Sequence, residues 1–266
     1  MMNTNVFSQS VQRYLMKTNN LLQTSMQRLS SGVRINSAAD DAAGLKVANI
    51  MSAKIGGFSA AIRNANDGIS LAQIAEGAMA EVSSIILRMR DLAVQASSGT
   101  YSDTDLDAMD LEFQALHLEI DRITGSTEFN GQNLLGGGTF TIAINPDDGS
   151  GVDIVIANLS AVAPAGDLQS SGNAATAIGA ADTALETVDA ERAAMGAAQS
   201  RLSSAISHLS NMRDNLSASR SRIMDTDFAV ETANFSKYQI MQQSALAVLA
   251  QANTLSRDIL YLLGRS

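Results

Sequence analysis

Proline is nearly absent from this chain of 266 residues, and its two copies lie close together. Pro146 and Pro164 are the only prolines, so residues 1–145 and 165–266 contain none. A chain of average composition has about 5% proline, which would be roughly 13 residues here. Because proline inside a helix removes a hydrogen bond and clashes with the preceding turn, this distribution predicts long helices in both arms of the chain.

The composition narrows the class of protein. The apolar fraction is 45% and the aromatic fraction 4%, with no tryptophan, so close-packed helices with small contact residues are favoured. The absence of cysteine excludes disulfide frameworks, thiolate metal sites and thiol nucleophiles. A net charge of −9 argues against a general electrostatic grip on nucleic acid or on an anionic membrane. We therefore expect protein partners, with no nucleic acid and no membrane among them.

The first arm reads as a series of helices. Apolar residues on one helical stripe predict a helix over about residues 6–30, namely Val11, Leu15, Leu22, Met26 and Leu29. Residues 34–44 read as a connector in which Ser37, Asp40 and Asp41 serve as caps. We expect a short helix over 45–53, an interruption at Gly56 and Gly57, and a long helix ending near Ser97.

A third helix follows a turn at residues 98–102. It carries an unbroken heptad seam that requires a partner helix: Leu106, Met109, Phe113, Leu116, Ile120 and Ile123. We expect Met79, Met89, Leu106 and Phe113 to pack within one chain.

The middle of the chain changes character. β-rich runs at 139–144 and 152–156 flank the turn residues 145–149, which predicts a β-hairpin. Residues 157–178 are rich in Ala, Ser and Gly and read as a loop with little packing of its own.

The second arm predicts a helix over about 181–219, a bend near 225–227 and a C-terminal coiled-coil helix. The C-terminal helix has eight consecutive heptad positions: Tyr238, Met241, Ala245, Val248, Ala252, Leu255, Ile259 and Leu262. The expected fold is mainly α, an antiparallel bundle or coiled coil of long helices from both arms with a small β-hairpin in the middle.

Residues that could carry chemistry are few. The two histidines, His117 and His208, lack any metal-binding spacing and read as helix-surface residues. Asp40 and Asp41 read as caps rather than catalytic carboxylates. We expect no catalytic, cofactor-binding or metal site, and no cofactor. The charged strip of Arg88, Arg90 and Asp91 is either a solvated face or a docking surface.

Neither a secretory signal peptide nor a continuous apolar span is expected. The start lacks a basic segment followed by an apolar one, and polar residues recur in every helical stretch.

Several motifs resemble bacterial flagellin. They occur in the family's order at both ends and cover about residues 1–135 and 180–266: LSSGVRINSAADDAAG at 29–44, RNANDGIS at 63–70, EIDRI at 119–123, TEFNG at 127–131, SRSRI at 219–223, DTDF at 225–228, VLAQAN at 248–253 and a final LLGR. The resemblance identifies the chain as a minimal flagellin with little or no variable outer domain, since only about 45 residues separate the matching arms.

The resemblance implies a structural subunit that polymerises into the flagellar filament and serves motility. Residues 1–40 and 225–266 would form an inner coiled-coil domain, and residues 41–224 a helical rod domain with a β-hairpin at about 139–160. The terminal helices would fold and pack between subunits on assembly. The residues expected to drive assembly are Leu15, Leu22, Leu29, Val248, Leu255, Ile259 and Leu262.

The resemblance also implies partners and a location. The filament lies outside the cell, and flagellins leave through the flagellar type III apparatus. An export chaperone would hold the C-terminal helix, with Tyr238, Met241, Leu255 and Leu262 as its contacts. Cap and hook-junction proteins are further expected partners.

A host Toll-like receptor is a further partner that the resemblance implies. The family's recognised epitope maps to Arg88, Leu92 and Glu112. Neighbouring positions depart from the family, with Leu87, Met89 and Asp91 where Gln, Val and Glu are frequent.

Two other functions stay open. A hook-filament junction protein shares the terminal helices, although the continuous match through 119–131 favours flagellin. An enzyme carried on a flagellin scaffold would need a catalytic insert, and the short middle segment has no His or metal triad.

Overall fold

The computed structural model describes residues 5–263, with side chains described as far as Thr254. It contains five α-helices and two antiparallel strand pairs among these residues: α1 (Val6–Ser31), α2 (Ala42–Ala96), α3 (Asp103–Ser126), β1 (Glu128–Phe129), β2 (Gln132–Asn133), β3 (Gly136–Ala143), β4 (Gly151–Asn158), α4 (Ser171–Met224) and α5 (Phe228–Leu263). The prediction of a mainly α chain with a small central hairpin is confirmed.

The chain divides into two compact units. The terminal unit comprises residues up to 53 and from 215 onward, and the central unit comprises 54–214. Both boundaries fall inside continuous helices, α2 and α4. The predicted inner coiled-coil domain (residues 1–40 and 225–266) and rod domain (residues 41–224) stay a prediction.

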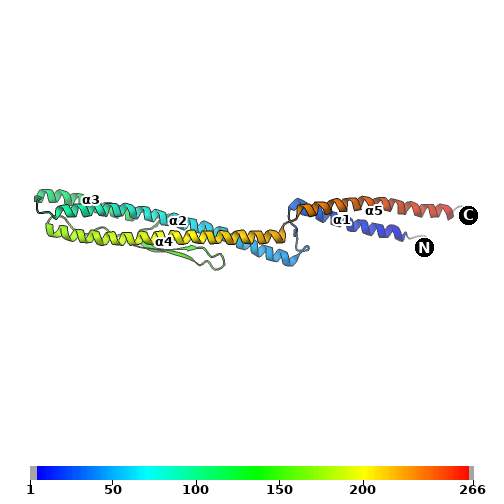
Figure 1. Cartoon of the computed structure of the whole chain (residues 1–266), viewed down its shortest axis with the longest axis horizontal. Coiled ribbons are helices and arrows are strands. Elements are labelled where there is room, and N and C mark those ends of the chain that lie inside the picture. The colour runs from blue at the N-terminus through cyan, green and yellow to red at the C-terminus, as the bar shows by residue number, and fades with distance from the viewer. Residues whose placement is uncertain (1–4, 264–266) are drawn as a thin grey trace. The chain divides into compact units, whose positions relative to one another are not determined.

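In the terminal unit, α1 and α5 lie side by side and antiparallel (Figure 1). Asn5 caps the start of α1 by accepting a hydrogen bond from the Ser8 N–H. Gly32 ends the helix in the left-handed region, with φ of 72°, where a side chain would be strained. The predicted antiparallel pairing of the two ends of the chain is therefore present.

A small antiparallel bridge joins the exits of α1 and α4, and we call it the clasp (residues 32–34 with 223–226). Val33 forms a β-bridge with Asp225, the Arg34 N–H donates to the Met224 carbonyl at 2.6 Å, and the Thr226 N–H donates to the Gly32 carbonyl at 3.0 Å. The Arg34 side chain adds a bond from Nη2 to the Ile223 carbonyl at 2.7 Å. The expected interruption at 225–227 is thus a helix break held by a partner segment.

Helix α2 runs without interruption through Gly56 and Gly57, where the sequence predicted a break. A helical glycine costs only about 1 kcal/mol relative to alanine, which packing offsets. Gly57 also leaves room for the hairpin turn, since a Cβ at this position would lie 2.5 Å from Pro146 Cβ. At the helix start, Asp41 accepts a hydrogen bond from the Gly44 N–H at 2.8 Å, which confirms its role as a cap.

Helix α3 begins with a capping box formed by Ser102 and Asp105. Its predicted seam is confirmed, because Leu106, Phe113 and Ile120 are buried and the intervening heptad residues pack against the same core.

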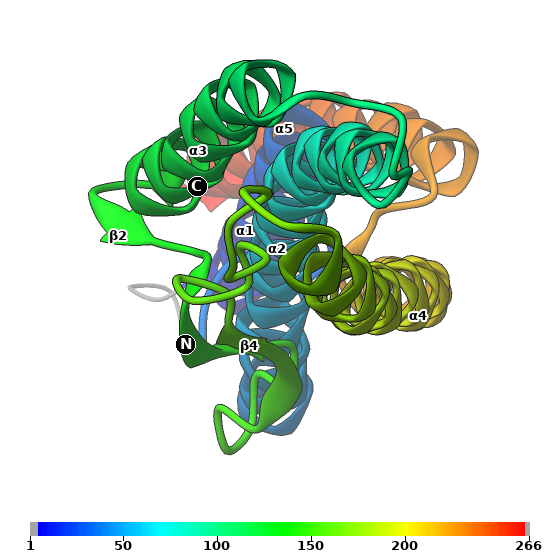
Figure 2. The same ribbon diagram turned by 90° about the vertical axis from the view of Figure 1, so that its left-hand side faces the viewer.

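The β3–β4 hairpin pairs Gly136 with Asn158 and Ala143 with Gly151. Alternate residues of β4 face the core, with Val152, Ile154 and Ile156 buried. The hairpin lies against α2 and α4, since the Asn64 side chain donates to the Ala143 carbonyl and a Glu191 oxygen accepts from the Ala157 N–H. Figure 2 shows α2, α3, α4 and the hairpin viewed along the helices.

The segment between the hairpin and the second arm is more ordered than the sequence predicted. Helix α4 begins at Ser171, ten residues before the expected start, because Ala174, Ala177 and Ala181 are buried at helical spacing. The expected slack loop packs into the core through Leu159 and Leu168, both fully buried. Alanines supply a contact face that a search for large apolar residues misses.

One continuous apolar core fills the central unit. Its largest fully buried side chains come from α2, α3, α4, the hairpin and the loops beside it: Met79, Ile86, Met89, Phe113, Ile120, Leu134, Leu135, Ile154, Ile156, Leu159, Leu168 and Met195. The expectation that Met79, Met89, Leu106 and Phe113 pack within the chain is confirmed.

By length and composition, α2 is apolar enough to cross a membrane, although polar residues interrupt its apolar runs as expected. The C-terminal half of the helix supplies Met79, Ile86 and Met89 to the core. Core helices of soluble proteins meet the same criterion, so this feature is weak evidence of a membrane span.

Candidate functional surfaces

The predicted assembly residues of α1 lie at the α1–α5 interface. Leu15, Leu22 and Leu29 are half-buried there. Met26, assigned to the same stripe, is 63% exposed and lies off the seam. The sequence missed three hydroxyl residues that complete the heptad spacing and are buried: Ser8, Thr18 and Ser25. The seam of α1 therefore alternates between apolar and polar side chains.

Among the α5 residues whose side chains are described, the buried apolar ones are Ala245 and Ala252, whereas Val248 is 41% exposed. Val248 is therefore not part of the α1–α5 seam. The chaperone candidates Tyr238 and Met241 are half-buried against α1. Leu255, Ile259 and Leu262 lie outside the residues whose side chains are described.

Side-chain hydrogen bonds join α1 and α5 at several points along the seam. Asn19 Oδ1 accepts from Gln242 Nε2 at 2.8 Å, and Ser25 Oγ donates to Glu231 Oε1 at 2.5 Å. Arg28 Nη1 lies 3.9 Å from the other carboxylate oxygen of Glu231, which is buried. Nearer the termini, Ser8 Oγ donates to Asn253 Oδ1 at 3.0 Å.

The terminal unit leaves a wide apolar surface open. A groove of about 540 Å³ between α1 and α5 is lined by Ser10, Val11, Tyr14, Ile240, Met241, Ser244, Ala245 and Val248. Tyr14 and Ile240 on its walls are 50% and 64% exposed. The exposed apolar side chains on its walls make this groove a candidate interaction surface.

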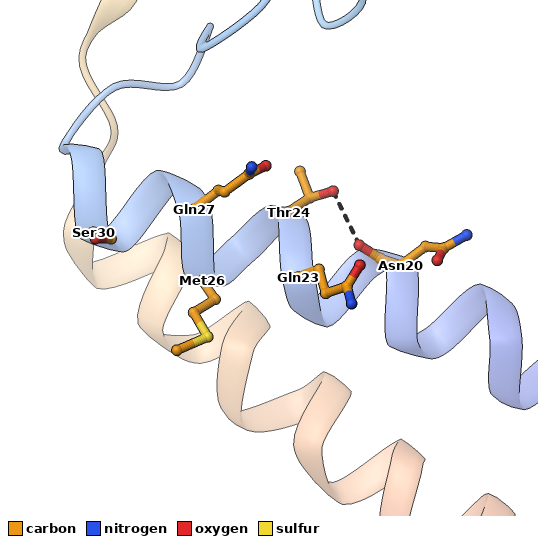
Figure 3. A pocket seen from close by; sticks show the side chains of 6 residues that line it. All are labelled: Asn20, Gln23, Thr24, Met26, Gln27 and Ser30. Atoms are coloured by element: carbon orange, nitrogen blue, oxygen red, sulfur yellow. Dashed lines mark hydrogen bonds between the residues drawn. The ribbon is translucent and has the colours of Figure 1, made fainter.

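A second hollow, of about 520 Å³, follows the outer face of α1 (Figure 3). Its lining is mostly amide and hydroxyl side chains, and the Thr24 hydroxyl donates to the Asn20 carbonyl within the helix. Met26 is the only large apolar residue in the lining. The lining has no titratable side chain, so acid–base chemistry has no residue there to perform it.

The three residues of the expected receptor epitope come together in the central unit. Arg88 Nε and Nη2 both donate to Glu112 Oε1, at 2.9 and 2.6 Å, across a groove of about 450 Å³ between α2 and α3. Leu92 lines the same groove but is only 3% exposed. The surface presented is therefore mainly the Arg88–Glu112 ion pair.

A neighbouring charged residue on α2, Arg90, has a structural role. Arg90 Nε donates to Asp182 Oδ1 of α4 at 2.6 Å. That hydrogen bond, with the attraction of the carboxylate, raises the pKa of Arg90 above its ordinary value. Arg90 is thus a link between two helices of the central unit.

The remaining candidates have structural roles or none. Asp40 accepts hydrogen bonds from the Asn36 and Ser37 N–H groups, and the bonds to the Ser37 and Asn36 backbone lower the pKa of the Asp40 carboxyl. His208 is exposed on α4, and His117 is half-buried on α3. Among residues 5–254, no group of three or more His, Cys, Asp and Glu side chains is placed to hold a metal ion.

The comparisons with known proteins agree with the geometry. The family model described as the bacterial flagellin N-terminal helical region matches residues 2–139, which is more than half of the chain. The chain belongs to the bacterial flagellin family. The flagellin C-terminal helical region matches residues 178–263. The unmatched segment between them contains the hairpin return and Pro164.

Individual flagellins match over different lengths. A flagellin of Halalkalibacterium halodurans is 42% identical over 248 residues, which is 91% of both chains. Flagellin A of Vibrio anguillarum is 55% identical over 135 residues, but the match spans only 36% of its length. Flagellin A of Vibrio cholerae is 50% identical over 154 residues, or 41% of its length. The chain thus matches well under half of these longer Vibrio relatives.

A solved structure supports the fold. The crystal structure of Bacillus cereus flagellin is 33% identical, with a TM-score of 0.52, and the match covers 55% of this chain and 88% of that one. The resemblance read from the sequence motifs is therefore confirmed at the level of the flagellin family.

Proposed function

We propose that this flagellin is the structural subunit of a bacterial flagellar filament, built by helical polymerisation. The observation that carries the proposal is the apolar groove between α1 and α5, with Tyr14 and Ile240 exposed on its walls. Burial of apolar surface is worth roughly 25 cal/mol per Å², so covering this groove with another copy stabilises the polymer.

The subunit contact is heterologous. A filament requires two different complementary surfaces on each copy, because a self-complementary patch would close into a dimer. The α1–α5 groove is one such surface, and exposed apolar residues on the other sides of the terminal unit, including Met16 and Met26, supply the other. Leu15, Leu22 and Leu29 contribute indirectly, by pairing α1 with α5.

The assembly test uses two adjacent positions on α5. Purified full-length chain is seeded with filament fragments and followed by sedimentation and electron microscopy. Ile240→Glu, which charges the groove wall, should abolish elongation. Gln239→Glu places the same charge on the neighbouring exposed residue and should retain it. Deletion of residues 235–266 should abolish assembly; filaments that form without this segment would overturn the mechanism.

A location outside the cell follows from a filament subunit. We propose export through the flagellar type III apparatus, with an export chaperone held by the C-terminal helix near Tyr238 and Met241. Leu255 and Leu262 belong to the same segment. The half-buried state of Tyr238 and Met241 means that chaperone binding competes with α1 for α5. Cap and hook-junction proteins meet the same terminal unit. Pull-down of the chaperone by variants of α5 tests whether the chaperone binds this segment.

Receptor activation is a proposal for the Arg88–Glu112 surface. Arg88→Ala and Glu112→Ala should each lower Toll-like receptor reporter activity, whereas Arg122→Ala removes an equally exposed ion pair, with Glu119, and should not. Because Leu92 is buried, its substitution would test folding as much as recognition. Unchanged reporter activity in both Arg88 and Glu112 variants would remove this proposal.

A structural role without catalysis fits the family and the groove. A hook-filament junction protein would be present in few copies per organelle, so counting this chain along isolated filaments distinguishes the two functions. Incubating filaments with general protease substrates tests for catalysis.

A further inference from the structure

The α1–α5 seam buries small and polar side chains. Within the part of the seam whose side chains are described, the positions less than 9% exposed carry hydroxyls, alanine methyls and one carboxylate: Ser8, Thr18, Ser25, Glu231, Ala245 and Ala252. The leucines of α1 on the same seam are half-buried. In an ordinary coiled coil these positions hold large apolar residues. The described seam therefore buries little apolar surface.

Large apolar side chains lie on the outside of the same two helices. Six of them are 36–64% exposed: Phe7, Tyr14, Leu21, Ile240, Leu246 and Val248. The central unit has the opposite arrangement, because the seam of α3 buries Leu106, Phe113 and Ile120. Burial of apolar surface is the main favourable term in folding, so the central unit gains this term within one copy. The α1–α5 pair leaves much of it for another copy to supply.

Glu231 weakens the pairing of α5 with α1 relative to an apolar residue. It is the one buried charged side chain among those described, at 7% exposed. Ser25 Oγ donates to it at 2.5 Å, while the nearest cationic nitrogen, Arg28 Nη1, is 3.9 Å away. Removing a carboxylate from water is costly, and an ion pair of imperfect geometry repays only part of that cost. Apolar residues at such sites often give the more stable structure.

Thr18 also contributes little to the pairing. It is 1% exposed, and its hydroxyl donates to the Tyr14 carbonyl of its own helix at 3.0 Å. This bond forms within α1 alone, so packing against α5 adds no hydrogen bond at this position. Thr18 therefore places a small polar side chain at a point where a larger apolar one would hold the two helices together.

The surface that can offset these costs is the groove beside the seam, with Tyr14 and Ile240 on its walls. Helices gain most of their stability from packing, and this groove is covered when another copy occupies it. We propose that Thr18 and Glu231 keep α1 and α5 apart in the free chain, so that the two helices pair only on the filament. This inference rests on the proposed function. Free chains then lack a finished groove, which confines growth to existing filament ends.

Two substitutions on the seam have matched counterparts off it. Thr18→Val and Thr24→Val each remove a hydroxyl that donates to the carbonyl four residues earlier at 3.0 Å, but Thr24 lies on the outer face of α1 (Figure 3). Glu231→Leu and Gln239→Leu each place a leucine on α5, but Gln239 is exposed. Arg28, whose side chain is 30% exposed, can turn its charged end to water when Glu231 is replaced.

The seam variant combines Thr18→Val with Glu231→Leu, and the control variant combines Thr24→Val with Gln239→Leu. Amide hydrogen exchange of each full-length free chain is measured without seeds by mass spectrometry. In the parent, residues 8–29 and 231–252 should exchange near the rate of an unfolded chain, and the same residues should be protected in sedimented filaments. The seam variant should slow their exchange in the free chain about tenfold, within the range for replacing a buried ion pair by apolar residues.

Two further readouts complete the experiment. The control variant should exchange at the parent rate, and the core residues 79–89 should stay protected in all three chains, which reports an intact central unit. The seam variant should also form sedimentable polymer without seeds, because part of the ordering cost is already met in the free chain. Parent and control chains should stay in solution until seeds are added.

Three results would overturn the proposal. A free parent chain protected at residues 8–29 as strongly as the filament would mean that pairing does not depend on assembly. A seam variant that exchanges as fast as the parent would mean that Thr18 and Glu231 do not keep the helices apart. A control variant slowed as much as the seam variant would mean that added apolar character acts anywhere on these helices.

The proposed function is tested separately by seeding the parent chain. A parent that does not elongate from filament fragments would overturn the filament role. In that case the free-chain exchange of the seam and control variants still decides whether Thr18 and Glu231 weaken the pairing.

Discussion

Arg88 on α2 donates two hydrogen bonds to one carboxylate oxygen of Glu112 on α3, with Nε and Nη2 at 2.9 and 2.6 Å from Oε1. Both side chains are about half exposed. Leu92 lies one turn further along α2, in the same groove, and is buried. An exposed ion pair and a buried core residue therefore lie on neighbouring turns of one helix face.

This arrangement predicts opposite consequences for the two α2 positions. Arg88→Ala should change the free energy of unfolding by less than about 1 kcal/mol, because exposed ion pairs contribute little. Leu92→Ala should cost about 2–5 kcal/mol, because it leaves a cavity in the central core. Urea denaturation followed by circular dichroism measures both. Equal losses for the two variants would contradict the division between surface and core.

Two glycines on helices should respond to alanine in opposite directions. Gly32 ends α1 with φ of 72°, so Gly32→Ala should destabilise the chain by about 1–2 kcal/mol. Gly77 lies inside α2 with open space where a Cβ would be placed, so Gly77→Ala should stabilise by about 0.5–1 kcal/mol. Thermal unfolding monitored at the helix signal tests the pair. A Gly32→Ala variant as stable as the parent would show that the left-handed turn is not required.

A third glycine tests how the hairpin packs. A Cβ on Gly68 would lie 2.8 Å from Ile142 Cγ1 and 3.1 Å from Leu202 Cδ1, between the hairpin and α4. Gly68→Ala should therefore cost about 1–3 kcal/mol through overpacking, despite the higher helix propensity of alanine. Gly77→Ala serves as the control for propensity. A gain of stability in Gly68→Ala would mean that the hairpin moves aside freely.

The capping box of α3 predicts a pH dependence. Hydrogen bonds from the Ser102 hydroxyl and then the Ser102 N–H lower the pKa of Asp105 below its ordinary value. A carboxyl whose pKa is lower in the folded state adds stability above its unfolded pKa, about 3.9, and loses that contribution as the pH falls through the folded pKa. Asp105→Asn should therefore unfold more easily than the parent near pH 7, and the difference should vanish in strong acid. Urea midpoints measured across this range provide the test; a difference that persists in strong acid contradicts it.

The sequence was most informative where large apolar residues repeat without exception. The six-residue seam of α3 and the heptads of α5 predicted both helices, because only a helix places such spacing on one face. Asp41 followed by two alanines and Gly44 predicted the cap of α2 for a similarly local reason. The family motifs, which lie in the two helical arms, were sufficient to identify a flagellin.

Long-range packing decided what local pattern could not. Gly56 and Gly57 read as a break, yet α2 continues through both, and Pro146, distant in sequence, lies where a Cβ on Gly57 would be. The start of α4 was invisible because its contact residues are alanines, which bury only when another element covers them. Val248 fits a heptad by spacing, but the real seam uses neighbouring positions on α5.

The sequence by itself determined the helical arms, the central hairpin and the flagellin family, because helix periodicity, turn residues and motifs are properties of short stretches. Only the tertiary structure decided that Ser25 meets Glu231 and that Val33 meets Asp225. Each of these pairs joins residues separated by most of the chain, and no periodicity encodes which of several equivalent heptads will pair. That choice is made by the cost of leaving a buried carboxylate or backbone group without its partner.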